Sequence, residues 1–207
     1  MRQLAAAYLL LISASPALGG TLVVRVVDPA GRPVDDAVVT IEPVGRPAKP
    51  ALRAGPYRVE QRDMVFHPFV SVVPVGAMVA FPNFDATRHH VYSFSPAKRF
   101  ELKLFARDQS RSVRFDKAGI IAIGCNIHDR MSAFLFVTNN GWAQRAERGT
   151  TMFRDAPSGP SKITVWHPFL RTPSSTVSRT LPLGEGSRAE TFVVRLRAPP
   201  LHGMDGY

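Results

Sequence analysis

The chain has 207 residues, a formal net charge of +10 and a single cysteine. A basic balance suits nucleic acid, an anionic membrane surface or an acidic protein as partner, but these cations are scattered singly or in pairs without interleaved aromatic residues, which argues against nucleic acid. One cysteine excludes an internal disulfide, so the core has to hold without one.

The first 19 residues have the organisation of a secretory signal peptide. Arg2 gives a short positive region, an apolar run follows at residues 4–12, and small residues lead to a cleavage box at Ala17-Leu18-Gly19. The apolar run is too short to favour a membrane span, and no other segment is long and apolar enough to cross a bilayer. We therefore expect a mature chain that begins near Gly20 and works in the periplasm without an integral membrane segment. An uncleaved N-terminal anchor is the alternative.

Short β-branched and apolar runs, separated by turn residues, continue along the rest of the chain and predict an all-β fold. Residues 21–27 (TLVVRVV) and 37–41 (AVVTI) flank a DPAG turn, which predicts a hairpin-like antiparallel opening. The regular spacing of such runs is typical of a sandwich or barrel. Further strand candidates lie at residues 70–73, 78–81, 90–94, 100–105, 112–115, 120–123, 133–137, 162–166 and 190–196.

A thiolate, an imidazole and a thioether occur close together in residues 125–131 (CNIHDRM), as Cys125, His128 and Met131. Soft sulfur donors combined with nitrogen select copper over calcium, magnesium or manganese. Strand candidates run into and out of this segment, so the three side chains share one short loop. Such a loop lets all three converge on a single ion.

A type 1 copper site needs a second histidine beside these three donors. The upstream sequence Arg88-His89-His90-Val91 supplies two candidates. Because adjacent residues on a strand point to opposite faces, only one of the pair is expected to enter the site. Alternation alone leaves both His89 and His90 open.

Two segments resemble plastocyanin- and amicyanin-type cupredoxins: VGAMVAFPNFDATRHHVYSF (residues 75–94) and FDKAGIIAIGCNIHDRM (residues 115–131). The resemblance implies a Greek-key β-sandwich with one type 1 copper ion bound by His89, Cys125, His128 and Met131. It selects His89, because in those sequences a valine follows the first ligand histidine by two positions. His90 stands where the family often has asparagine, and it remains the alternative ligand.

The flanking sequences resemble a different module. TLVVRVVDPAGRPVDDAVVTIEP (residues 21–43) is similar to the start of a carboxypeptidase regulatory-like β-sandwich, and SGPSKITVWHPFL (residues 158–170) is similar to a late strand of one. A cupredoxin block within such flanks resembles periplasmic proteins labelled methylamine utilization proteins, a label that does not establish a role in methylamine oxidation. We therefore divide the chain into a signal peptide (1–19), N-terminal sandwich strands (20–60), a cupredoxin domain (61–138), a C-terminal β-rich segment (139–197) and a disordered tail (198–207).

Two further histidines share a local sequence, His67 in VFHPFV and His167 in VWHPFL. Neither has a cysteine or carboxylate at ligand spacing, so we interpret both as strand-end or surface residues rather than a second metal site. The sequence contains no nucleophile elbow and no glycine-rich loop before a helix. A metal with four protein donors also leaves no position for a substrate, so we expect a protein that is not an enzyme.

The expected function is single-electron transfer. The resemblance implies that His128 is the ligand nearest to solvent, through which electrons pass. We expect an apolar shell around the ion to exclude water and help set its potential, and an amide N–H of Ile127 or His128 to donate to the Cys125 sulfur. The residues expected in that shell are Phe81, Ile121, Ile123 and Phe134.

The charge around the site indicates the partner. Between Phe81 and Met131 the sequence has nine Lys and Arg against five Asp and Glu, and Arg130 stands where related loops often carry an aromatic residue. A basic rim favours an acidic redox protein, met in a fast and salt-sensitive encounter. Two other functions are open: a copper-trafficking module that holds Cu(I) without redox turnover, and an interaction protein that retains the block as a scaffold.

Overall fold

The structure is a computed structural model, and it describes residues 19–51, 55–128 and 130–198. These residues are all-β, which confirms the predicted fold class of a central sandwich with additional strands. The predicted signal peptide, except for Gly19, and most of the predicted tail lie outside the described residues. The strands are β1 (Gly20–Val27), β2 (Val38–Pro43), β3 (Tyr57–Arg58), β4 (Glu60–Arg62), β5 (Val65–His67), β6 (Val70–Pro74), β7 (Ala77–Pro82), β8 (His89–Ser93), β9 (Phe100–Phe105), β10 (Ser110–Phe115), β11 (Gly119–Gly124), β12 (Ser132–Thr138), β13 (Ala143–Arg145), β14 (Thr150–Ala156), β15 (Gly159–Trp166), β16 (Thr176–Leu183) and β17 (Ser187–Val193).

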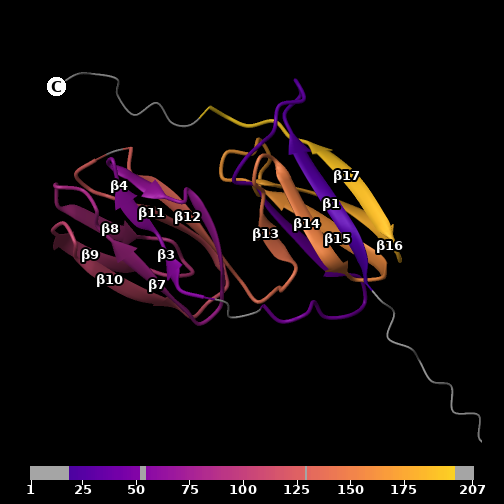
Figure 1. Ribbon diagram of the computed structural model, residues 1–207, viewed down its shortest axis with the longest axis horizontal. Helices are drawn as coiled ribbons and strands as arrows, with labels where there is room; N and C mark the ends of the chain where they lie inside the picture. The colour runs from indigo at the N-terminus through magenta and orange to yellow at the C-terminus, as the bar shows by residue number, and fades with distance from the viewer. Residues whose placement is uncertain (1–18, 52–54, 129, 199–207) are drawn as a thin grey trace, which may run out of the picture.

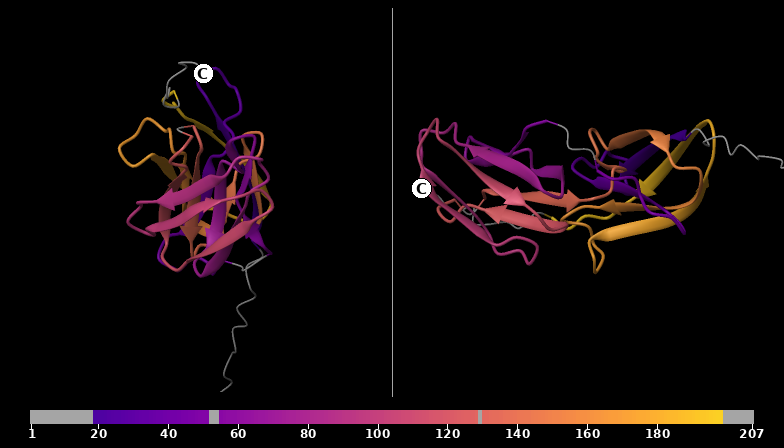
Figure 2. Two further views of the ribbon diagram at one scale, coloured as in Figure 1. Left: turned by 90° about the vertical axis from the view of Figure 1, so that its left-hand side faces the viewer. Right: turned by 90° about the horizontal axis from the view of Figure 1, so that it is seen from below.

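The strands form two sandwiches that lie next to each other along the long axis of the molecule (Figures 1 and 2). The central sandwich contains β3 to β12, with a five-stranded sheet in the order β6-β12-β11-β8-β9, a three-stranded sheet in the order β10-β7-β3, and the β4–β5 hairpin. The second sandwich pairs the sheet β14-β1-β17 with the sheet β13-β2-β15-β16. It is thus built from both ends of the described chain, which close on each other around the central block.

The core of the central sandwich follows from the period-2 alternation of its strands. In β7, Ala77, Val79 and Phe81 are buried while Met78 is exposed. These side chains meet Ile121, Ile123 and other apolar residues of the five-stranded sheet in one cluster. Burying one such aliphatic or aromatic side chain contributes about 1.5–3 kcal/mol, so this cluster is a main source of the stabilisation that holds together the two sheets that carry the candidate site.

The predicted hairpin between residues 21–27 and 37–41 is wrong in its second strand. The DPAG turn forms and is followed by an antiparallel bridge between Val27 and Pro33, but residues 37–41 do not pair with β1. β1 pairs with β14 and β17, whereas β2 pairs with β13 and β15, so the two strands belong to opposite sheets of the second sandwich. The physical reason is the burial of β2 on both faces: Val39 and Ile41 enter the core of the second sandwich, while Val38 faces the central one. A hairpin partner of β1 would have had one solvated face.

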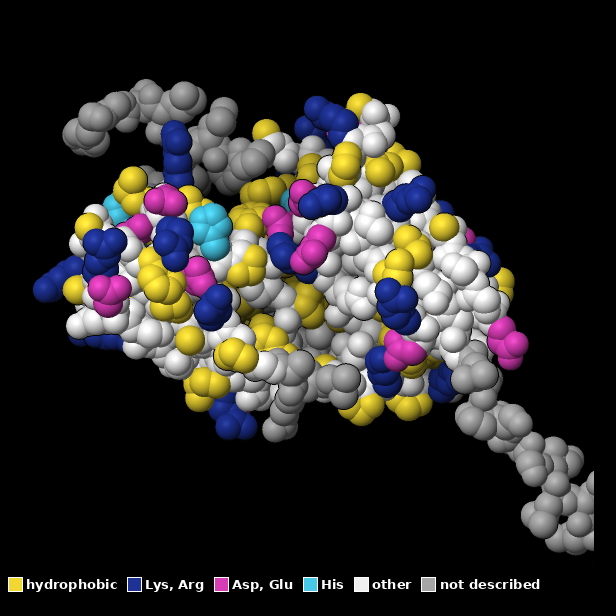
Figure 3. Space-filling model, viewed as in Figure 1, with side chains coloured by type: hydrophobic (Ala, Val, Ile, Leu, Met, Phe, Trp, Pro, Cys, Tyr) yellow, Lys and Arg dark blue, Asp and Glu magenta, His cyan; other side chains and the backbone are white. Residues whose placement is uncertain are grey.

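The two sandwiches meet at an apolar junction. Val38 and Trp166 of the second sandwich pack against Val70 of the central one, with Phe69, Phe134 and Phe136 around them. Apolar side chains are also visible in the hollow between the sandwiches in Figure 3. The flanking strands therefore have their own core and also contact the outer face of the five-stranded sheet. Within the described residues, no helix has the length and apolarity needed to span a membrane.

Candidate metal centre

The upstream histidine is positioned by the start of β8. His89 is fully buried and faces the interior, as do Val91 and Ser93 two and four residues later. Its Nε2 lies 2.7 Å from Asp85 Oδ2, while its Nδ1 is buried and has no hydrogen-bond partner. Because a carboxylate accepts, Nε2 carries the proton, and the lone pair on Nδ1 is directed at something other than protein. An orphaned buried nitrogen of this kind fits a metal ligand.

The other donors come from the loop between β11 and β12. The loop is closed by two backbone hydrogen bonds, from Cys125 N to Met131 O (3.1 Å) and from Met131 N to His128 O (3.0 Å). Cys125 and Met131 are buried, and both belong to the core cluster of the central sandwich. The short connection between two paired strands thus brings the ends of the loop together, as the sequence predicted.

Three donor atoms converge where this loop meets β8. The ligand atoms of His89, Cys125 and His128 all lie within 4.8 Å of one another, and Cys125 Sγ is 3.9 Å from His128 Nδ1. The two imidazole rings are 5.0 Å apart, at an angle of 65°. An ion bound at about 2.0–2.3 Å from each donor in a tetrahedral or trigonal arrangement has donors about 3.3–3.8 Å from one another. Donor atoms that already lie within 4.8 Å of one another therefore fit a metal ion after a small approach. Among the described residues, no other group of three His, Cys, Asp or Glu side chains has this geometry.

A hydrogen-bonded carboxylate holds His89 in place. Asp85 Oδ1 accepts from the amide N–H of Asp63 (2.6 Å), and Asp85 Oδ2 accepts from the amide N–H of Met64 (3.0 Å) as well as from His89. Burial would raise the pKa of the Asp85 carboxyl, but the Met64 amide, the His89 imidazole and the Asp63 amide outweigh it and hold that pKa below its ordinary value. Asp85 therefore remains an acceptor that fixes both the tautomer and the orientation of His89.

Sequence reasoning did not find this role of Asp85. The only signal in the sequence is a carboxylate four residues before the histidine. The spacing has no meaning on its own, because the two residues lie on a loop and a strand rather than on one helix. What gives Asp85 its role is the β4–β5 hairpin, whose turn supplies the two amide donors.

His90 lies on the other face of β8. Its Nε2 is 2.8 Å from Glu101 Oε1 on the neighbouring strand β9, and its ring is next to Tyr92. Its Nδ1 is also buried without a hydrogen-bond partner, so position and not the unpaired nitrogen distinguishes the two histidines. The structure thus brings His89, and not His90, to Cys125 and His128. Strand alternation sends one histidine of the pair inward, as expected, and the identity of the inward one agrees with the sequence resemblance.

Three of the four residues predicted for the apolar shell, Phe81, Ile121 and Ile123, lie in the core cluster that contains Cys125 and Met131. Phe134 does not belong to it, because the side chains of β12 alternate: Ala133 and Leu135 face the interior, and Phe134 faces the second sandwich. Neither Ile127 nor His128 has a described amide hydrogen bond to the Cys125 sulfur.

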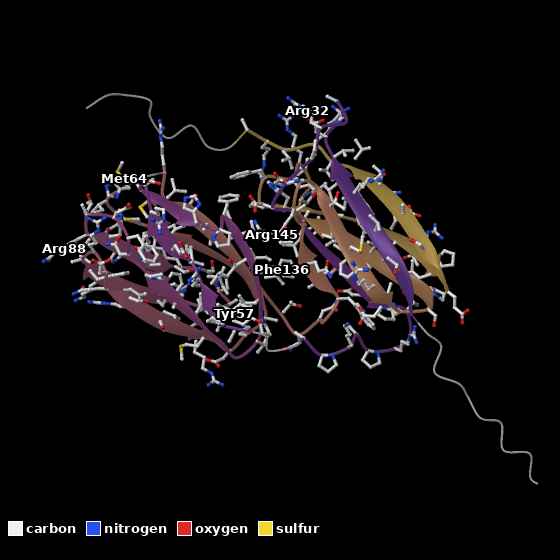
Figure 4. The ribbon with its side chains drawn as sticks, in the orientation of Figure 1. Arg32, Tyr57, Met64, Arg88, Phe136 and Arg145 are labelled. Carbon is white, nitrogen blue, oxygen red and sulfur yellow. The ribbon has the colours of Figure 1, made fainter. Side chains whose placement is uncertain are left out.

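The surface over the site mixes apolar and basic side chains. Met64 and Ile127 are both about half exposed, and His128 is only partly buried. Arg88 and Arg130 are exposed nearby in the sequence, and the Arg62 guanidinium lies over the Phe84 ring. Figure 4 labels Met64 and Arg88 at the end of the central sandwich that points away from the second one, and Figure 3 shows cations, carboxylates and apolar groups interspersed there.

The two histidines of the HPF sequences lie elsewhere. His67 is exposed at the end of β5, and His167 is buried after β15, where its Nδ1 accepts the amide N–H of Phe169. Neither joins the metal cluster, in agreement with their interpretation as strand-end residues.

No protein-family model matches the sequence, and no curated protein matches it. Solved structures do match part of it. An amicyanin variant in its Cu(I) form is 24% identical, with 50% of this chain and 100% of that chain covered and a TM-score of 0.38. The purple cupredoxin from Nitrosopumilus maritimus is 17% identical, with 40% and 99% covered and a TM-score of 0.37. The copper-containing nitrite reductase from Thermus scotoductus is 26% identical, with 56% and 28% covered and a TM-score of 0.39.

Proposed function

We propose that this protein is a type 1 copper protein that carries single electrons in the periplasm. His89, Cys125 and His128 would hold the ion as its strong donors, with Met131 as a weak donor beside them. The observation that carries the proposal is the convergence of His89, Cys125 and His128, whose donor atoms all lie within 4.8 Å of one another. Copper bound there would supply a Cu(II)/Cu(I) couple.

The residues of the chain suit a site whose geometry changes little. Asp85 fixes the His89 ring, and the two backbone hydrogen bonds between Cys125, His128 and Met131 fix the loop. The apolar neighbours in the core bury the side chains of both sulfur ligands. Four protein donors leave no open position for a substrate, which favours a carrier over an enzyme. His128 is the partly exposed member of the three donors that converge, so we propose that electrons enter and leave through it.

We further propose that the redox partner is an acidic protein. The exposed apolar groups of Met64 and Ile127 offer a contact surface, and exposed arginines, among them Arg88 and Arg130, flank it in the sequence. A surface of this composition accelerates encounter with a negatively charged partner more than it tightens the complex. This can be tested with small reagents. The copper-loaded protein should exchange electrons faster with an anionic hexacyanoferrate than with a cationic complex of similar potential, and added salt should reduce the difference.

The decisive experiment is the visible spectrum of the purified mature chain after addition of Cu(II). An intense thiolate-to-copper charge-transfer band is expected, and Cys125→Ser and His89→Ala should each abolish it. His90→Ala is the matched control and should keep the band, because His90 binds Glu101 on the opposite face. Tight, colourless binding of Cu(I) would instead favour trafficking, and a chain that binds no copper would favour a scaffold. Loss of the band in His90→Ala alone would overturn the ligand assignment.

A further inference from the structure

The strand that leaves the metal loop also forms the junction with the second sandwich. β12 begins at Ser132, directly after Met131, and its side chains alternate between two environments. Ala133, Leu135 and Val137 are buried in the core that contains Cys125 and Met131, whereas Phe134 and Phe136 face the second sandwich. One strand thus contacts the candidate ligands on one side and the neighbouring sandwich on the other.

Aromatic rings clamp the outer face of β12. The Phe134 ring lies 5.5 Å from Phe69, 6.0 Å from Trp166 and 6.5 Å from Phe169, in edge-to-face arrangements of 82°, 67° and 88°. Trp166 also lies 5.6 Å from Phe136. Edge-to-face aromatic pairs are favourable beyond the area that they bury. Figure 4 labels Phe136 where the two sandwiches meet.

The two HPF sequences supply this clamp from both sides. Phe69, which follows His67-Pro68, and Phe169, which follows His167-Pro168, stack at 5.8 Å and 28°. The carbonyl of Phe69 accepts the amide N–H of Phe134 at 2.8 Å, so the clamp also holds the backbone of β12. Phe169 is fixed in turn by His167 Nδ1 and by the amide N–H of Arg197, which donates to its carbonyl at 2.7 Å.

A displacement of β12 would also move the proposed ligands, because only a few residues separate Phe134 from Met131 and Cys125. In the ladder with β11, Phe134 is opposite Ala122 and Ser132 is opposite Gly124, the residues that lead into Cys125. The carbonyl of Met131 accepts the amide N–H of Cys125. Because a close-packed interior transmits strain rather than absorbing it, repacking around Phe134 shifts the end of the loop that carries two of the proposed ligands.

We propose that Trp166 and Phe169 of the second sandwich are positioning residues for the metal loop, acting through Phe134 on Met131 and Cys125. This inference rests on the proposed copper function for its meaning, but its geometry involves no metal. The second sandwich would then determine the copper environment as well as stabilise the chain. If the junction only stabilised the fold, a substitution there would change the metal loop no more than any other substitution that lowers stability by the same amount.

The experiment compares Trp166→Leu with Phe153→Leu in the full mature chain. Phe153 is buried in the core of the second sandwich and lies outside the junction cluster. Phe153→Leu therefore also removes one buried aromatic ring from the second sandwich, but away from the junction. Both variants should unfold at lower temperature. Only Trp166→Leu should shift the charge-transfer bands of the copper-loaded protein or change their intensity ratio, and only it should release copper to a chelator several-fold faster.

A second readout uses the metal-free protein. Cys125 is 5% exposed, so its alkylation under native conditions requires the loop to open. The alkylation rate should rise several-fold in Trp166→Leu and stay near that of the unsubstituted protein in Phe153→Leu. If the two variants change both readouts equally, or if neither does, the positioning role is refuted. If Trp166→Leu does not fold, Trp166→Phe is measured in its place against the same control.

Failure of the proposed function would look different. A chain that binds no copper in any variant removes the spectroscopic readout and refutes the copper function. The alkylation rates in the metal-free protein then still decide whether the junction positions the loop.

Discussion

At the scale of single residues, the candidate centre depends on a carboxylate as much as on its ligands. Asp85 receives three hydrogen bonds, from the amides of Asp63 and Met64 and from His89 Nε2. The histidine ring is therefore held in place beside Cys125 and His128 by protein groups alone. Preorganisation of this kind removes an ordering cost from metal binding, and partners of ligand histidines commonly contribute 10–100-fold to affinity.

We predict that Asp85→Ala weakens copper binding by about 10–100-fold, because His89 loses the acceptor that fixes its ring and tautomer. Asp85→Asn should cost less, since an amide oxygen can still accept from Nε2–H. Competition titration against a chelator of known affinity measures both. Glu101→Gln is the control: it changes the carboxylate partner of the outward His90 and should leave copper affinity unchanged. Equal losses in Asp85→Ala and Glu101→Gln would show that the effect is general electrostatics rather than orientation of His89.

The grouping of His89 with Cys125 and His128 was largely predictable from the sequence, whereas the role of Asp85 beside His89 was not. Cys125, His128 and Met131 are close in sequence, so spacing alone indicated a shared site. Strand alternation shows that only one of His89 and His90 faces inward, but it does not show which one. The sequence resemblance selected His89. Asp85 was not predictable, because its role depends on donors that fold over it from a separate hairpin.

Among the secondary-structure elements, the β4–β5 hairpin connects the exposed Met64 side chain with the buried His89, because the amides of its turn donate to Asp85. Its turn residues Asp63 and Met64 have φ of 55° and 56°, the left-handed conformation of a two-residue hairpin turn. Such turns usually contain Asn-Gly or Asp-Gly, and the sequence Asp63-Met64 carries no such signal, which is why no hairpin was predicted there. A bulky residue in this conformation is strained, and the strain is retained where two amides must face Asp85.

We predict that Met64→Gly raises the free energy of unfolding of the metal-free protein by about 1 kcal/mol, because glycine removes the left-handed penalty of roughly 1–2 kcal/mol and the exposed Met64 side chain contributes little packing. Copper affinity should not change, since the amide N–H is kept. Met64→Pro removes that N–H and cannot adopt a positive φ, so it should lower both stability and copper affinity. Chemical unfolding and chelator competition measure the two effects, and a destabilised Met64→Gly would contradict the argument.

At the scale of the whole molecule, the sequence indicated the type of fold better than its connections. Most strand candidates were identified from apolar runs between turns, and Phe81, Ile121 and Ile123 were placed in the correct core. The predicted pairing of β1 with β2 was wrong because it was inferred from their proximity in the sequence. The burial of both faces of β2 would have argued against that pairing. Phe134 was assigned to the metal shell for a similar reason, since the sequence does not show that the outer face of β12 is covered by residues from positions 38 and 166.

The junction also contains a buried titratable group, and this gives stability a defined dependence on pH. Burial of His167 lowers its pKa below the ordinary value, and the nearby Asp36 carboxylate raises it only in part. The folded protein therefore keeps His167 neutral at a pH where the unfolded chain, with an ordinary histidine pKa of about 6.5, already binds a proton. Stability is fully present above that value and falls as pH decreases through it toward the lower folded pKa.

We predict that replacing His167 by asparagine reduces this loss of stability on acidification. His167→Asn leaves a side-chain oxygen near the position of Nδ1 to accept the Phe169 amide N–H, but it cannot be protonated in this range. Chemical unfolding of the metal-free protein above and below the ordinary histidine pKa measures the difference for each chain. Every other residue is the same in the two chains, so the difference between them isolates His167. The pH-dependent loss should be smaller in His167→Asn. If both chains lose the same stability on acidification, the burial of His167 at the junction does not lower its pKa, and the prediction is wrong.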